Sequence, residues 1–286
     1  MEGATLGSQA LSFVPQHPPQ AGSYTFDVND ATPTGSAGSV NLVLQAILLP
    51  LALASDTSNL TLYGGTTVPM SPSALYVEKV YLPSLFEMGI RAKFTHAIWG
   101  FYPGGGGQVQ VEIKGGTALR GFDFTRRGAL LRVEGLAFAA KLPSHIPQRM
   151  TNRARSILKD AGFDTQIAPQ HVPSPGLGTG LFLCARYEFG QAGFLSLGRK
   201  GLPSEEVAEI GCRELLEHHC TGAAVDPHMG DQLVLPFALA KGGSEATVSE
   251  ITRHLLTNVW VAHQFGFSHV TVVGEEGEPG LLQAID

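Results

Sequence analysis

Charged residues and cysteines are scarce in this chain, and it has no long uninterrupted apolar run. Only 15% of its 286 residues are charged, and Lys+Arg number 19 against 25 Asp+Glu. The formal net charge of −6 argues against a protein that coats duplex nucleic acid through many phosphate contacts, but it is compatible with binding a single nucleic-acid end. Because 43% of the residues are apolar, a mostly disordered chain is excluded as well.

Membrane and secretory signals are also missing from the sequence. The strongest apolar stretch, residues 42–54, is interrupted by Gln45 and Pro50 and is shorter than the roughly 20 residues that a span needs. The N-terminus has no basic segment followed by an apolar one, so we predict no signal peptide. Three cysteines without a CxxC pair indicate no disulfide framework. The His-His-Cys run at 218–220 points in several directions on a helix and is not interpreted as a metal site. We expect a cytoplasmic protein without a membrane partner.

Strand and helix patterns alternate along the chain, which predicts an α/β fold with helices covering sheets. Runs of β-branched and aromatic residues predict strands at Asn59–Tyr63, Arg91–Trp99, Gln108–Lys114, Ala129–Ala139, Leu181–Tyr187 and His269–Val273. Apolar residues at three- and four-residue spacing predict helices at Ser39–Ala54, Ser73–Met88, Ile146–Ala161, Ser204–His219, Pro227–Ala240 and Thr252–Phe265. Two turn-rich stretches, Thr117–Gly128 and Thr221–Asp226, predict the boundaries of an inserted α/β domain of about 95 residues.

The stretch DPHMGDQLVLPFALA predicts a helix with a polar start. Asp226 suits the N-cap and Pro227 the first helical position, while His228, Asp231 and Gln232 fall on one face. A polar stripe at the start of an otherwise apolar helix suits phosphate binding, because the helix N-terminus has free N–H groups. Plain capping by solvated side chains is the alternative.

A second polar motif, TVSEITRHLLTN, predicts another helix start. Thr247 with Glu250, or else Ser249, is expected to cap it. His254 then lies in the first or second turn, where the helix dipole favours the neutral imidazole that a nucleophilic histidine needs. An ordinary surface or core histidine is the alternative.

Two further stretches are candidates for contact with phosphate. The Gly/Ser-rich residues 34–39 precede the helix that carries Gln45 and could cradle phosphate, although the lysine of a P-loop is missing. Arg149 and Arg153 lie one helical turn apart in the densest basic stretch. They suit either contact with an RNA backbone or a solvated helix face.

Several motifs together resemble the RNA 3'-terminal phosphate cyclase family. They are GSAGSVNLVLQ, LYGGTTVPMSPS, YVEKVYLPSLFEMGI, FYPGGGGQVQVEI, LPSHIPQRM, AAVDPHMGDQLVLPFALA and RHLLTN. The resemblance implies repeated units of a four-stranded sheet backed by two helices, with a smaller inserted α/β domain. It assigns residues 1–128 and 223–286 to the repeated-unit domain and residues 129–222 to the insert.

The resemblance also implies a reaction and its residues. ATP, with Mg²⁺ or another divalent cation, would convert an RNA 3'-phosphate end into a 2',3'-cyclic phosphodiester through a histidine–AMP intermediate. His254 corresponds to the nucleophile and Gln45 to an ATP contact. The ATP-binding stretch corresponds to His228, Met229, Gly230, Asp231 and Gln232. A homodimer is compatible with the resemblance.

The N-terminus departs from the family pattern. The opening MEGATLGSQ resembles the end of a first repeat whose Gly-rich start is missing, so we predict that this 286-residue form is poorly soluble or inactive. Two alternatives are a non-catalytic RNA-binding relative and an enolpyruvyl-transferase-like enzyme. The presence of His254, Asp231 and Gln232 argues against the first. The lack of a convincing Lys/Arg cluster argues against the second.

Overall fold

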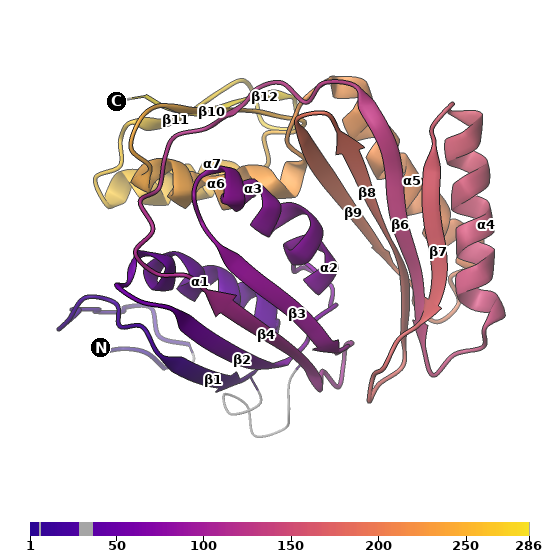
Figure 1. Cartoon of the computed structure of the whole chain (residues 1–286), viewed down its shortest axis with the longest axis horizontal. Helices are drawn as coiled ribbons and strands as arrows, with labels where there is room; N and C mark the ends of the chain where they lie inside the picture. Colours follow the sequence, from indigo (N-terminus) through magenta and orange to yellow (C-terminus); the bar gives the residue numbers. More distant parts are fainter. Residues whose placement is uncertain (6, 29–36, 286) are drawn as a thin grey trace.

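Three four-stranded sheets, each with helices on one face, make up the computed structural model of the protein (Figure 1). The structure describes residues 1–5, 7–28 and 37–285. The first half of the predicted phosphate-cradling turn at 34–39 therefore lies outside the described residues. Within them, no helix is long and apolar enough to cross a membrane.

The first unit, residues 23–113, has strand order β1-β2-β4-β3. Its elements are β1 (Ser23–Asp27), α1 (Val40–Leu53), β2 (Ser58–Gly64), α2 (Ala74–Tyr76), η2 (Val77–Tyr81), α3 (Leu82–Glu87), β3 (Ala92–Ile98) and β4 (Gly107–Ile113). Strands β1 and β2 run parallel, whereas β4 is antiparallel to both of its neighbours. Helix α1 begins after Ser39, whose hydroxyl accepts hydrogen bonds from the N–H groups of Asn41 and Leu42, as an N-cap does. The segments α2, η2 and α3 form one helical run with a π-helical turn in its middle.

The second unit repeats this arrangement. Its elements are β5 (Asp123–Phe124), α6 (Pro227–Leu239), β10 (Ser244–Val248), α7 (Arg253–Gln264), β11 (Val270–Val273) and β12 (Gly280–Ala284). Read from β5, the order β5-β10-β12-β11 matches the first sheet strand by strand, and again only the first pair is parallel. Helices of both units share one hydrophobic core. The predicted repetition of sheet–helix units is confirmed.

The chain between β5 and α6 of the second unit forms a third unit. Its elements are β6 (Leu130–Ala140), α4 (His145–Asp160), β7 (Thr165–His171), β8 (Gly178–Tyr187), β9 (Gly190–Leu197) and α5 (Ser204–Thr221). Helices α4 and α5 cover one face of its sheet, ordered β7-β6-β8-β9, and form a separate core with it. The opposite face contributes Phe138 and Phe182 to the core that the first two units share. The division into a repeated-unit domain and an inserted domain stays a prediction.

All the predicted helices and strands form, with ends close to those expected. The mixed α/β fold class is confirmed. Sequence patterns missed β1, β5, β7, β9, β10 and β12. One expected cap is wrong: Thr247 lies in β10 and Ser249 directly follows it, whereas Thr252 caps α7 by accepting a hydrogen bond from the N–H of Leu255. Strand β10 includes the first half of the proposed capping box, so the helix starts later.

Candidate active site

Helices α1, α6 and α7 enclose a cavity of about 610 Å³ between the first and second units. Most of its lining is apolar. The polar side chains in it are Gln45 from α1, Asp231 and Gln232 from α6, and Asn258 from α7, together with Tyr81 from η2. A concave, mostly apolar site with a few convergent polar groups is the usual form of a small-molecule site.

The N-terminus of α6 is held as the sequence predicted. The Asp226 carboxylate accepts hydrogen bonds from the N–H groups of His228 and Met229, at 3.0 and 2.9 Å. His228 is exposed, whereas Met229 and Gly230 are buried. A Cβ at Gly230 would lie 3.1 Å from a methyl carbon of Val248, so a small residue lets α6 approach β10. Met229 and Gly230 thus serve packing in this structure, and His228 faces solvent.

Gln45 and Gln232 occupy equivalent places in the two repeated units. Each lies six residues after the N-cap of its helix, Ser39 for α1 and Asp226 for α6. The Gln45 Nε2 donates a hydrogen bond of 2.5 Å to Gln232 Oε1, and Gln232 Nε2 donates to the His228 carbonyl at 2.7 Å. The equivalent glutamines of the two units therefore pair through their side-chain amides across the cavity.

Asp231 is the strongly perturbed carboxyl group of the cavity. Burial raises the pKa of its carboxyl from 3.8 to about 6, while the nearby His228 and His254 lower it and Asp226 raises it. Its Oδ1 is buried and has no hydrogen-bond partner among the described residues. A buried, unpartnered carboxylate oxygen is rare unless a ligand uses it.

Helix α7 brings two polar residues close to Asp231. His254 is exposed in the first turn, and its charge is felt at Asp231. One turn further on, the side-chain amide of Asn258 donates a hydrogen bond of 3.4 Å to the main-chain carbonyl oxygen of Asp231. Asn258 was not among the residues predicted from the sequence, although its four-residue spacing from His254 puts both on one helix face.

The first unit has no counterpart to the Asp231 and His254 side chains. Counted from the N-caps, the corresponding residues are Leu44 in α1 and Leu75 in α2. Both are buried in the core. The acidic and imidazole groups are therefore confined to the second unit, and the first contributes its glutamine.

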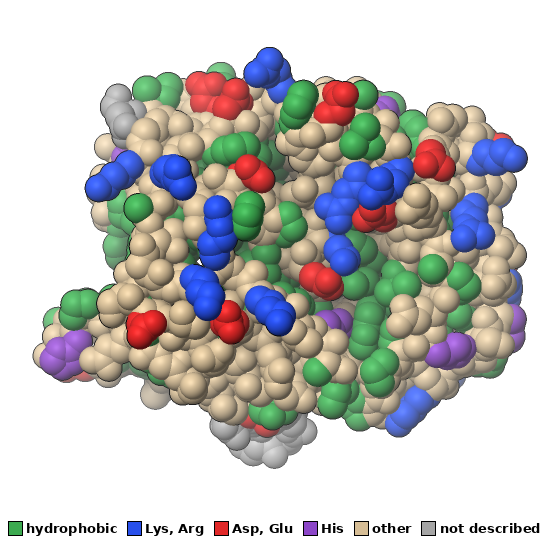
Figure 2. Space-filling model, in the orientation of Figure 1, with side chains coloured by type: hydrophobic (Ala, Val, Ile, Leu, Met, Phe, Trp, Pro, Cys, Tyr) green, Lys and Arg blue, Asp and Glu red, His purple; other side chains and the backbone are tan. Residues whose placement is uncertain are grey.

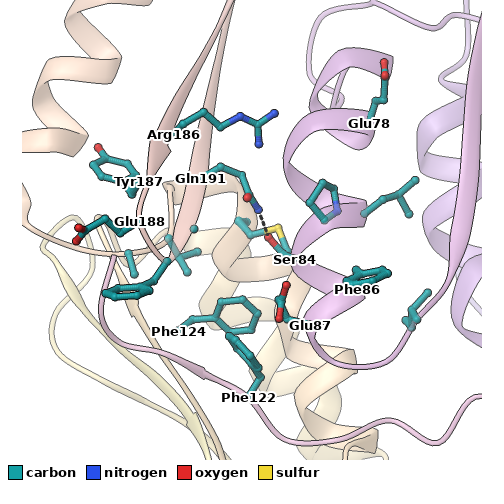
Figure 3. A pocket seen from close by; sticks show the side chains of 18 of the residues that line it. Glu78, Ser84, Phe86, Glu87, Phe122, Phe124, Arg186, Tyr187, Glu188 and Gln191 are labelled. Carbon is teal, nitrogen blue, oxygen red and sulfur yellow. Dashed lines mark hydrogen bonds between the residues drawn. The ribbon is translucent and has the colours of Figure 1, made fainter. Parts of the chain in front are cut away.

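A larger cavity, of about 780 Å³, lies between η2–α3 and the β8–β9 hairpin (Figure 3). Aromatic rings line its lower part, and Gln191 donates a hydrogen bond to Ser84 across it. Of the predicted site residues it contains only the buried Met229. Basic and acidic side chains are mixed around this hollow (Figure 2), and the Arg186 guanidinium there pairs with Glu134 at 3.1 Å. The candidate chemistry lies in the smaller cavity.

The basic stretch of α4 is occupied by ion pairs. Arg149 makes two hydrogen bonds of 2.6 Å to Glu205, and Arg153 pairs with Glu209 at 2.7 Å. The partners come from α5, so these arginines link the two helices of the third unit. This arrangement favours the solvated helix face over an RNA contact.

The chain matches known proteins along nearly its whole length. The family model for RNA 3'-terminal phosphate cyclase matches residues 1–272. The chain belongs to this family. It is 48% identical over 272 residues to the RNA 3'-terminal phosphate cyclase of Nostoc punctiforme, covering 95% of this chain and 78% of that protein. The cyclase of Methylococcus capsulatus is 49% identical over 282 residues, with 98% and 78% covered, and that of Pyrococcus abyssi 35% over 285 residues, with 100% and 81% covered.

In this member of the cyclase family, the residues proposed from motifs fall into three groups. Gln45, Asp231 and Gln232 line one cavity. His254 lies beside it, at the exposed start of α7. The third group, His228 to Gly230, forms the capped first turn of α6. Their roles remain predictions.

Proposed function

We propose that this protein converts an RNA 3'-terminal phosphate into a 2',3'-cyclic phosphodiester at the expense of ATP. Membership of the cyclase family supports this activity. One observation indicates where in the protein the reaction takes place. Asp231, with a buried and unpartnered carboxylate oxygen, lies beside His254 and next to the Gln45–Gln232 pair in one cavity.

His254 is the proposed nucleophile. A lone pair of its neutral imidazole attacks the α-phosphorus of ATP, the P–O bond to the β-phosphate breaks, and pyrophosphate leaves. The ring then loses the proton on its other nitrogen to solvent. The exposure of His254 in the first turn of α7 leaves it accessible to a bound nucleotide.

Two transfers complete the proposed reaction. An oxygen of the RNA 3'-phosphate attacks the phosphorus of the histidine-bound AMP, and the histidine nitrogen leaves and regains a proton. The vicinal 2'-hydroxyl then loses its proton and attacks the 3'-phosphorus, and AMP is expelled. Covalent catalysis divides one difficult transfer into easier steps, each with a good leaving group.

Asp231 fits a role in holding the divalent cation that ATP brings. Mg²⁺ in nucleotide sites is usually held by one or two carboxylates together with phosphate oxygens and waters. The unpartnered Asp231 Oδ1 matches that donor set. Within the part of the chain that the structure describes, no cluster of three or more His, Cys, Asp or Glu offers an all-protein cage. The cation, when bound, would neutralise phosphate charge during transfer.

The test uses α-labelled ATP with Mg²⁺ and the full chain. We expect an acid-labile protein–AMP adduct in the wild type and in His263→Ala, and none in His254→Ala. His263 lies on the same helix and is likewise exposed, so it controls for helix damage. Label that persists in His254→Ala would move the nucleophile elsewhere. A wild type that binds RNA 3'-phosphate ends but forms no adduct would instead support a non-catalytic RNA-binding relative.

A further inference from the structure

Asp226 is a fully buried carboxylate at the point where all three units meet. Its Oδ1 accepts a hydrogen bond of 2.7 Å from the Tyr76 hydroxyl, in addition to those from the first turn of α6. Its Oδ2 accepts one of 3.1 Å from the N–H of Gly193 in β9. One side chain thus connects α2 of the first unit, α6 of the second and β9 of the third.

The packing around this carboxylate leaves little freedom. Asp226 is 0% exposed and Tyr76 is 4% exposed. A Cβ at Gly193 would lie 2.9 Å from the Tyr76 ring and 2.7 Å from a methyl carbon of Val80, so the glycine lets β9 approach the helical run closely. Moving any one of the three elements would break a hydrogen bond to a buried charge, which is costly.

The donor set requires an acceptor-only side chain. Three N–H or O–H donors converge on Oδ1 and one on Oδ2, so an amide NH₂ in either place would face at least one donor. Burial raises the pKa of the Asp226 carboxyl, while His228 and the Tyr76 hydroxyl lower it. The positive end of α6 also favours the carboxylate.

The N-cap and the cavity are rigidly connected. Asp231 lies five residues along α6 from Asp226, about 7.5 Å at the rise of an α-helix. Gln232 follows and must meet Gln45 from α1 at hydrogen-bonding distance. Any tilt of α6 at its N-terminus would therefore be passed on to both cavity residues.

We infer that Asp226 and Tyr76 are positioning residues for the nucleotide site: their hydrogen bond, with that to Gly193, fixes the start of α6 and so places Asp231 and Gln232 against Gln45. This inference rests on the proposed ATP-dependent function. It gives the third unit a part in the reaction, because β9 supplies one of the bonds to Asp226.

The test compares two tyrosine variants. Tyr76→Phe removes the bond to Asp226, whereas Tyr187→Phe makes the same change at another buried tyrosine, whose hydroxyl contacts His219. We expect Tyr76→Phe to raise the KM for ATP in adduct formation about three- to tenfold, the size of one lost buried hydrogen bond, with kcat nearly unchanged. Amide exchange at residues 228–230 should speed up by a similar factor. Tyr187→Phe should change neither.

A second variant separates capping from linkage. Asp226→Ser keeps a good N-cap but is too short to reach Tyr76 and Gly193 as well. We expect it to raise KM at least as much as Tyr76→Phe. An unchanged KM and unchanged exchange in Tyr76→Phe would overturn the inference, as would equal effects of both tyrosine variants. If the wild type forms no adduct, the proposed function fails, and the exchange at 228–230 alone decides whether Tyr76 positions α6.

Discussion

The Gln45 amide donates a hydrogen bond to the Gln232 carbonyl oxygen across the cavity, at 2.5 Å, between residues 187 positions apart in the chain. The two glutamines hold the same position in two repeats of one sheet–helix unit. The repeated topology thus brings a matched pair of side chains to the interface between the repeats. The second repeat adds Asp231 and His254, where the first has buried leucines.

Gln45→Leu tests the amide pair. The variant loses the donor to Gln232 and leaves the partner amide unpaired, so we expect the Kd for ATP to rise about tenfold. Gln148→Leu is the control, because Gln148 makes a side-chain hydrogen bond within α4, in the third unit. In the double variant Gln45→Leu, Gln232→Leu, the Kd for ATP should rise by less than the product of the two single-variant fold-changes. Strictly multiplicative effects would contradict a shared role.

Asp231→Asn tests the proposed cation contact. Removing the charge while keeping the shape should slow adduct formation at least about tenfold and raise the Mg²⁺ concentration needed for half-maximal rate. Adding a chelator should abolish adduct formation in the wild type. Asp160→Asn, at the exposed end of α4, should leave both quantities unchanged. An unaltered Mg²⁺ dependence in Asp231→Asn would place the cation elsewhere.

We expect the buried His218 to make the protein less stable in acid. Burial, with the charges of Arg127 and His219, lowers the pKa of its imidazole from 6.5 to about 3, and neither ring nitrogen has a hydrogen-bond partner among the described residues. The unfolded chain therefore binds a proton that the native protein does not between pH 6.5 and 3, so stability falls as pH falls through this window.

His218→Phe should remove this sensitivity. The ring lies against Tyr187 and Phe194, so an apolar ring suits the site. We expect the free energy of unfolding to rise by about 1 kcal/mol at pH 7. Between pH 6.5 and 3, its dependence on pH should be shallower than that of the wild type by at most about 1.4 kcal/mol per pH unit. Urea unfolding at pH 7, 6, 5 and 4 measures both, and parallel curves would contradict the prediction.

Gly178→Ala tests how the third unit docks on the first. The added Cβ would lie 2.2 Å from the Phe101 ring, which packs on Phe138 in β6. We expect a loss of about 1–3 kcal/mol in the free energy of unfolding, the usual cost of overpacking. Gly176→Ala, where a Cβ would meet nothing within 4 Å, should change it by less than about 0.5 kcal/mol. If Gly178→Ala changed the free energy of unfolding as little as Gly176→Ala, the Phe101 ring would have to move aside at little cost in free energy.

Elements with local signals were predictable from the sequence. Helix α4 shows the reason: Met150, Ala154 and Leu158 recur every fourth residue and are all fully buried. The strands that were missed carry weak or contrary signals. Strand β7 contains Pro169, which is tolerated because β7 is an edge strand of its sheet. Strand β5 has two residues and exists only through its pairing with β10.

The sequence by itself determined the fold class, the family resemblance and the polar start of α6, because periodicity, capping and motif spacing act over a few residues. Tertiary structure alone decided which of those polar residues meet. The hydrogen bond between Gln45 and Gln232 and the burial of Asp231 depend on the packing of one unit against another. The convergence of Tyr76 and Gly193 on Asp226 depends on it as well. Contacts between residues 33 to 187 positions apart leave no local pattern, so only the assembled core shows them.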